Sequence, residues 1–169
     1  VSMDNKWLVD SFPEFDELSE KEIEEIKTFS IMWSLFEGRY LDSSANADSI
    51  ERFIISLDEM NKLEIKDISG YLDYFSDRYI KDGETNNKFD NLHLRQNDKP
   101  TLVRNVLLRE TNNTSKIVTA LLIIVYRYRN NFFHGIKWEY GFEDQLDNFR
   151  QSNNLLKFIM DISLPKSGE

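Results

Sequence analysis

Apolar side chains recur at steps of three and four residues along most of the chain, the spacing of one face of an α-helix. The first stripe follows Ser19, which stands three residues before Glu22 and predicts a helix start with a capping box. Its apolar members are Ile23, Ile26, Phe29, Trp33, Phe36 and Tyr40. The pattern therefore predicts a helix from Ser19 to about Leu41.

Further stripes predict more helices after a loop at residues 42–46. Asp67 is expected to cap one of them, and Pro100 suits the first turn of another. These helices are expected over about residues 50–60, 67–79, 100–107, 115–134 and 142–162. The run Ala120–Val125 is apolar all round, so its helix is expected to be the most deeply buried.

The segments between the predicted helices are expected to be loops rather than strands. Residues 81–98 contain few apolar positions and form the longest predicted loop, and no segment alternates as a strand would. The fold class is therefore predicted as all-α, a bundle of five to six helices. Residues 19–169 are expected to form one domain, with residues 1–18 as an N-terminal arm that holds a short helix and packs on the body.

Charge is unevenly spread along the 169 residues, whose net charge is −9. Residues 1–70 hold 17 acidic and 7 basic side chains, whereas residues 71–169 hold 13 and 14. The acidic half is a poor surface for nucleic acid, so any RNA site is expected to be local and in the second half.

Composition also excludes several classes of site. The chain has no Cys, which rules out disulfides, thiolate catalysis and Cys-ligated zinc. Its start lacks the pattern of a signal peptide, and its longest apolar run is too short to span a bilayer. A cytoplasmic protein without a membrane segment is expected.

The end of the helix predicted over residues 115–134 carries the candidate chemistry. Here the apolar run gives way to a polar cluster that includes Arg129, Asn130 and His134. Asn130 and His134 are four residues apart and share a helix face, whereas Arg129 lies about 140° from His134 around a regular helix. The long arginine side chain, or a loosened last turn before Gly135, can bring all three groups together.

These residue types suit cleavage of the RNA backbone. A histidine can move protons near neutral pH, and an arginine can stabilise the charge of the phosphorane. An amide such as that of Asn130 can orient the imidazole or a phosphate oxygen, and the ribose 2′-hydroxyl can be the nucleophile. Two histidines without a carboxylate cluster at ligand spacing make a poor metal site, so no metal or cofactor is expected.

The segment Arg129-Asn130-Asn131-Phe132-Phe133-His134, followed by Gly135, resembles the R-x4-H motif of HEPN domains in its R-N-x-x-x-H form. That family is a helical bundle with the motif near the end of a late, buried helix. It includes toxin ribonucleases, abortive-infection proteins and RNA-targeting CRISPR nucleases, and its active members usually dimerise so that two motifs share one cleft. The resemblance implies a metal-independent endoribonuclease of toxin or defence type, with Arg129 and His134 catalytic and Asn130 supporting them.

Several neighbouring residues have open roles. Glu37 can pair with Arg129 or can lie exposed on its own helix, and His93 can touch substrate or simply lie on the surface. The residues expected to support the site or bind substrate are Glu37, Arg127, Asn131, Tyr128 and Lys137. The alternative for Arg127 and Arg129 is to cap the end of the helix or to pair with the acidic N-terminal half. The alternative for Tyr128 is a place in the core or in a dimer seam.

The acidic N-terminal half supports a second hypothesis, a non-catalytic HEPN-like module that binds a basic protein partner as an antitoxin, immunity or accessory protein. Under this hypothesis Arg129 and His134 lie buried in ion pairs, with no open cleft. Under the catalytic hypothesis two copies bring solvent-exposed motifs together.

Overall fold

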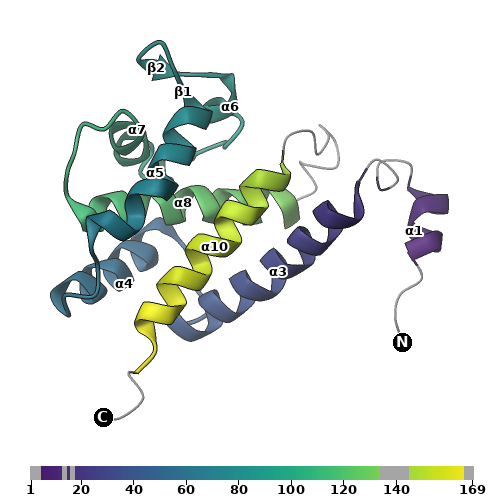
Figure 1. Cartoon of the computed structure of the whole chain (residues 1–169), viewed down its shortest axis with the longest axis horizontal. Helices are drawn as coiled ribbons and strands as arrows, with labels where there is room; N and C mark the ends of the chain where they lie inside the picture. Colours follow the sequence, from purple (N-terminus) through teal and green to yellow (C-terminus); the bar gives the residue numbers. More distant parts are fainter. Residues whose placement is uncertain (1–4, 13–14, 16–17, 134–144, 166–169) are drawn as a thin grey trace.

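The computed structural model describes residues 5–12, 15, 18–133 and 145–165 of the chain. It is a bundle of α-helices with one very small sheet, so the predicted all-α fold class is confirmed (Figure 1). Within the described residues, no helix is both long enough and apolar enough to cross a membrane.

Two long helices, α3 (Glu20–Tyr40) and α10 (Leu146–Ser163), lie side by side although they are distant in the sequence (Figure 1). The predicted capping box is present at the start of α3: the Glu22 amide donates to Ser19 Oγ at 3.2 Å, and the Ser19 amide donates to Glu22 Oε2 at 2.9 Å. Phe29 of α3 meets Phe149 of α10 edge to face. The residues expected at 142–144 in the last helix lie outside the described residues.

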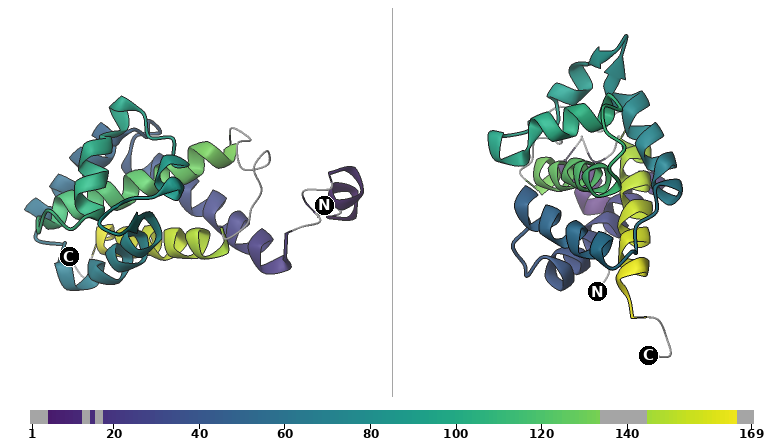
Figure 2. Two further views of the ribbon diagram at one scale, coloured as in Figure 1. Left: turned by 90° about the horizontal axis from the view of Figure 1, so that it is seen from above. Right: turned by 90° about the vertical axis from the view of Figure 1, so that its left-hand side faces the viewer.

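Helix α8 (Thr114–Phe133) runs through the centre of the bundle (Figure 2). Helices α4 (Ala47–Glu59), α5 (Ile65–Tyr79) and α7 (Pro100–Leu107) pack on it. Every residue from Ile117 to Val125 is at most 2% exposed, as expected for a helix that is apolar all round. The polar C-terminal end of α8 therefore directly follows the most deeply buried stretch of the same helix.

The segment predicted as a long loop contains short regular elements. Strands β1 (Ile80–Lys81) and β2 (Glu84–Thr85) form an antiparallel hairpin, followed by α6 (Asn87–Asp90) and the 3-10 turn η1 (Gln96–Asp98). Asp82 and Gly83 have φ of 54° and 79°, the left-handed pair that a tight hairpin turn requires. The expectation of no strand was wrong because these strands are too short to alternate, although the Asp-Gly pair was a readable turn signal.

The start of α5 also differs from the prediction. Asp67 is not the N-cap: α5 begins at Ile65, Glu64 holds the cap position, and no side chain caps the helix. Asp67 lies in the first turn, where its negative charge faces the positive end of the helix dipole.

The N-terminal arm contains a short helix, α1 (Asn5–Ser11), which stands apart from the bundle (Figures 1 and 2). Phe15 and Leu18, after this helix, pack against the core, whereas Trp7 is 58% exposed and Phe12 is 45% exposed. The rings of Trp7 and Phe12 contact each other edge to face. The expected packing of the arm on the body is thus found for its last residues and not for α1.

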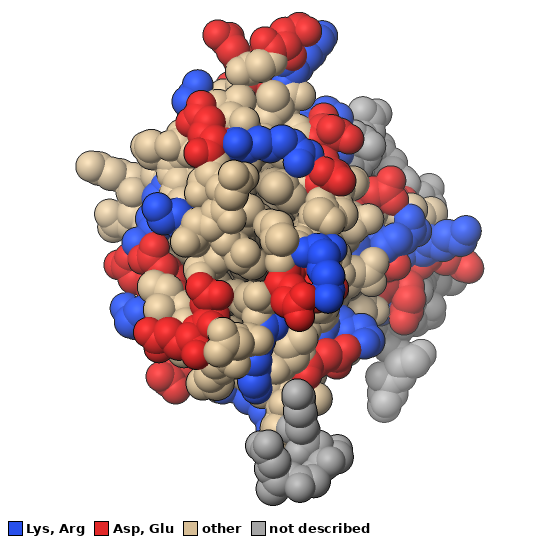
Figure 3. All heavy atoms as spheres, turned by 60° about the vertical axis from the view of Figure 1, so that its left-hand side comes forward, with Lys and Arg blue, Asp and Glu red and all other residues tan. Residues whose placement is uncertain are grey.

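The surface charge is mixed where it can be viewed. On the face in Figure 3, acidic and basic side chains are interspersed and neither sign forms a continuous field. Local ion pairs contribute to this mixing: Lys99 Nζ lies 2.8 Å from both Asp48 and Glu51 of α4.

Candidate functional site at the end of α8

The end of α8 presents its polar residues in two directions. Arg129 points toward α3 and keeps about a third of its side chain exposed, whereas Arg127 and Asn131 are buried on another side of the helix. This split follows from helix geometry, because Arg127 and Asn131 are four residues apart and Arg129 lies roughly 200° around the axis from Arg127. Asn130, between the two directions, is 8% exposed.

Glu37 of α3 is the ionic partner of Arg129. Its Oε2 lies 3.6 Å from Arg129 Nη2, so the pairing expected for these residues is confirmed and the exposed alternative is not observed. Trp33 Nε1 donates to the same oxygen at 2.7 Å, and the Ala45 amide donates to Oε1 at 3.2 Å. The carboxylate is held in place by a ring and a backbone amide before it meets the arginine.

The rest of the Arg129 side chain contacts its own helix. Arg129 Nη1 donates to Asn130 Oδ1 at 3.0 Å, and the guanidinium carbon lies 5.3 Å from the centre of the Phe133 ring. Phe133 itself is 55% exposed. Arg129 Nε is buried and has no hydrogen-bond partner within the described part of the chain. The guanidinium is thus oriented from two sides and still reaches solvent.

Arg127 has a different setting, in a buried contact with the segment before α7. Its Nε donates to the Leu92 carbonyl at 3.0 Å, and its Nη1 lies 3.2 Å from Asp98 Oδ2, with both side chains almost fully buried. Burial lowers the pKa of the Arg127 guanidinium, while the charge of Asp98 acts in the opposite direction. Asn131 Nδ2 also donates to the Leu92 carbonyl, at 3.3 Å.

Tyr128 lies in the core, one of the places that the sequence left open. Its hydroxyl is hydrogen-bonded to that of Tyr79 on α5, and its ring packs near Phe75. Burial is the main cause of the raised pKa of both tyrosines. In this conformation the Tyr128 ring is not available to stack on a base.

Two of the predicted site residues, His134 and Lys137, lie outside the described residues. The shared face of Asn130 and His134 therefore stays a prediction from helical spacing.

Two contributors to this region were not anticipated from the sequence. Trp33 was assigned to the core stripe of its helix, and its indole is indeed buried, yet it also donates to Glu37. Asp98 is separated by 29 positions from its partner Arg127, and nothing in their spacing predicts an ion pair. Polar residues are common just before a helix, and Asp98 stands two positions before Pro100, so only the fold identifies it as the partner of Arg127.

No protein-family model, no curated protein and no solved structure matches this chain. Within the described residues, no group of three or more His, Asp or Glu side chains is arranged to hold a metal ion.

Proposed function

We propose that this chain is a HEPN-type endoribonuclease that cleaves RNA without a metal, in a toxin or phage-defence role. The ribose 2′-hydroxyl attacks the adjacent phosphate, the bond to the 5′-oxygen of the next nucleotide breaks, and a 2′,3′-cyclic phosphate remains. His134 moves the protons, Arg129 stabilises the phosphorane, and Asn130 positions the reacting groups.

The observation that carries the proposal is the setting of Arg129. A guanidinium held by Glu37 and Asn130 at the end of a rigid, buried helix, and still one-third exposed, is preorganised to receive a phosphate. Its ionic contact with Glu37 is long at 3.6 Å, so both groups can retain solvent on their open sides. The R-N-x-x-x-H spacing of Arg129, Asn130 and His134 adds the proton-transfer group.

A cleavage assay on labelled RNA tests this function. Arg129→Ala and His134→Ala are each expected to lower the rate by about 10² or more, as is typical for loss of a transition-state donor or a general acid. Activity is expected to persist in EDTA, and the products to carry 2′,3′-cyclic ends. Arg104→Ala, an exposed arginine of α7, is the matched control and should retain full activity.

Equal rates for wild type, Arg129→Ala and His134→Ala would overturn the assignment. So would complete loss of activity in EDTA with recovery on added divalent metal.

The ion pair between Arg129 and Glu37 also favours a second candidate, a non-catalytic binding module. A guanidinium that is already paired needs no phosphate, and the acidic N-terminal half suits a basic partner such as a cognate toxin. This candidate predicts no RNA cleavage by the wild type and salt-sensitive binding to a basic protein encoded beside it. The cleavage assay above separates the two candidates.

A further inference from the structure

The segment from Asn91 to Asp98 is fixed against α8 by three kinds of contact. The Leu92 side chain is buried in the core, and its carbonyl accepts from both Arg127 Nε and Asn131 Nδ2. The Asp98 carboxylate accepts from the Arg95 amide at 2.8 Å and pairs with Arg127. We call these contacts of Arg127, Asn131 and Asp98 the loop clasp.

The clasp contains a buried ion pair, and such pairs contribute little to stability. Desolvation of two charges offsets most of their attraction, and replacement by apolar residues is often neutral. What a buried pair does fix is one arrangement of the elements that carry it. The clasp therefore defines where the segment 91–98 lies along α8 more than it stabilises the fold.

The residue that this arrangement presents is His93. Its neighbours on both sides are anchored, since Leu92 is buried and Leu94 packs against the core. Its amide donates to the Asp90 carbonyl at 3.0 Å, its backbone has a left-handed φ of 51°, and its side chain is exposed. An exposed histidine is thus held on a backbone that has little freedom to move.

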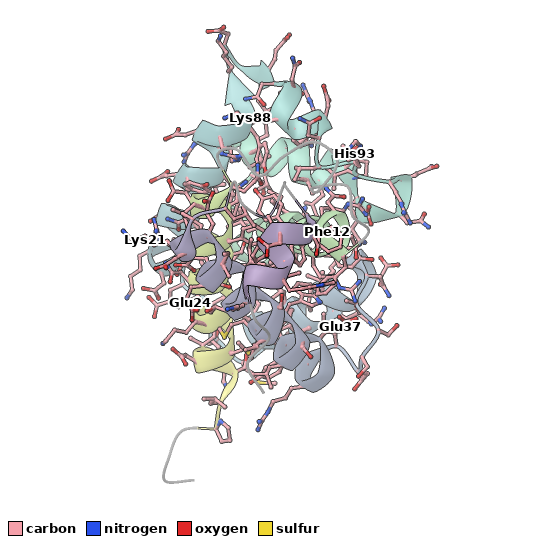
Figure 4. The ribbon with its side chains drawn as sticks, turned by 90° about the vertical axis from the view of Figure 1, so that its right-hand side faces the viewer. Phe12, Lys21, Glu24, Glu37, Lys88 and His93 are labelled. Carbon is pink, nitrogen blue, oxygen red and sulfur yellow. The ribbon has the colours of Figure 1, made fainter. Side chains whose placement is uncertain are left out.

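The position of His93 relates it to the site at the end of α8. Figure 4 views the molecule from the end of α8 that carries Arg129, and His93 and Glu37 lie on opposite sides of that helix. Lys88 of α6 lies on the same side of α8 as His93, to its left in this view. Because Arg129 points toward Glu37, an RNA strand whose scissile phosphate meets Arg129 reaches His93 by crossing the end of α8.

We propose that His93 is a second RNA-binding residue, donating an N–H to a phosphate oxygen away from the scissile bond, and that the loop clasp is the device that positions it. This inference rests on the proposed ribonuclease function and deepens it. It gives Arg129 and its neighbours different roles. Arg129 faces the reacting phosphate, while Arg127 and Asn131 hold the segment 91–98, whose His93 binds the flanking strand.

The first experiment measures binding of a labelled, mixed-sequence oligoribonucleotide whose riboses are 2′-O-methylated and so cannot be cleaved. His93→Ala is expected to raise Kd about three- to tenfold, the net effect of one typical hydrogen bond in water. The matched control is Asn61→Ala, which also places alanine at an exposed left-handed position (φ 53°), in the α4–α5 connection. It should leave Kd unchanged.

The second experiment separates positioning from a general effect on the fold. The double variant Arg127→Met/Asp98→Asn removes both buried charges and keeps an acceptor for the Arg95 amide. It is expected to raise Kd about as much as His93→Ala does, with an unchanged single-turnover cleavage rate at saturating RNA. When His93→Ala is already present, the double substitution should have no further effect on Kd. If Arg127 and Asp98 acted only on the stability of the fold, the double substitution would raise Kd in that background as well.

The two proposals fail in different ways. If the wild type cleaves RNA while His93→Ala binds the probe as tightly as the wild type, only this inference is overturned. If the wild type neither binds nor cleaves RNA, the ribonuclease proposal falls and this inference falls with it.

Discussion

At the scale of single residues, the setting of Glu37 shows how the site is organised before any ligand arrives. Its carboxylate accepts from Trp33 and from the Ala45 amide, so its place is fixed by groups that carry no charge of their own. Arg129 meets a carboxylate that has little rotamer freedom left to lose. Preorganisation of this kind is what makes a charged group effective in a transition state.

Replacement of Glu37 by glutamine tests this role. Glu37→Gln keeps the shape of the side chain but removes its charge, and one amide hydrogen then opposes a donor from Trp33 or Arg129. We expect kcat for RNA cleavage to fall about tenfold, with little change in KM, because the orientation of Arg129 matters most in the transition state. Glu24→Gln, an exposed glutamate of the same helix, is the control, and steady-state kinetics of both variants is the measurement. A kcat of Glu37→Gln equal to that of the control would contradict the role given to this carboxylate.

The buried hydroxyl pair of Tyr79 and Tyr128 makes a prediction about stability. Tyr128→Phe leaves the Tyr79 hydroxyl without its partner and should lower the free energy of unfolding by about 1–2 kcal/mol. Tyr79→Phe/Tyr128→Phe should lose less than the sum of the two single variants, because it leaves neither hydroxyl unpaired. Urea denaturation of the wild type, the two single variants and the double variant measures this coupling. A loss in the double variant equal to the sum of the two single losses would argue against it.

The same pair gives a pH dependence at high pH. Both tyrosines have a raised pKa in the folded chain, so the unfolded chain releases their protons first, near pH 10. Stability from this source is complete below that pH and is lost as the pH rises above it. The Tyr79→Phe/Tyr128→Phe variant should therefore lose stability less steeply between neutral pH and pH values above 10, as measured by thermal unfolding. An identical slope in wild type and variant would exclude the pair as the cause.

At the scale of elements, the start of α3 depends on one local motif. Ser19→Ala removes the acceptor for the Glu22 amide and should destabilise the protein by about 1 kcal/mol. Ser34→Ala, in the exposed middle of the same helix, should be neutral or slightly stabilising because alanine favours helix interiors. The urea midpoints of the two variants are compared with that of the wild type. Equal shifts for both variants would show that the cap does not stabilise the protein.

The elements that the sequence predicted well are those that repeat one signal many times. Residues of α3 and α8 each place apolar groups on a face over five or more turns, and α3 also has a complete capping box. The hairpin of β1 and β2 escaped prediction because two-residue strands carry no periodicity, and α5 begins without a side-chain cap. Local signals were too short or absent at both places.

The candidate site divides in the same way. The pairing of Arg129 with Glu37 was open to prediction because a charged residue interrupts the end of a core stripe on α3. The clasp of Arg127 to Asp98 was not, because it joins residues whose neighbourhood exists only after α7 and α8 have packed. Helical spacing predicts contacts within an element, whereas these contacts depend on the arrangement of several.

At the scale of the whole molecule, a net charge of −9 limits how the chain can bind RNA. The proposed function therefore requires that affinity for RNA come from a few basic groups near the end of α8, and the resemblance to HEPN domains implies a second copy whose motif completes the cleft. We expect specific cleavage activity to fall on dilution as the dimer dissociates, in step with the oligomer measured by sedimentation. Activity per chain that stays constant through dissociation would show that one copy suffices.

The salt dependence of binding follows from the same charge. With few phosphates contacted, the slope of log K against log salt is expected to be about −2 or shallower for single-stranded RNA. The measurement is a titration of the 2′-O-methylated probe at several salt concentrations. A much steeper slope would indicate a broad basic track rather than the local site proposed here.

The hydrogen bond from the Trp33 indole to Glu37 makes the intrinsic fluorescence of Trp33 sensitive to the state of the site. Trp33 is buried and donates to Glu37, which in turn pairs with Arg129. Any ligand that draws Arg129 away from Glu37 therefore changes the electric field at the indole. With Trp7 and Trp138 replaced by phenylalanine, emission would come from Trp33 alone. Occupancy of the site could then be followed by fluorescence in unlabelled protein, in real time and independently of turnover.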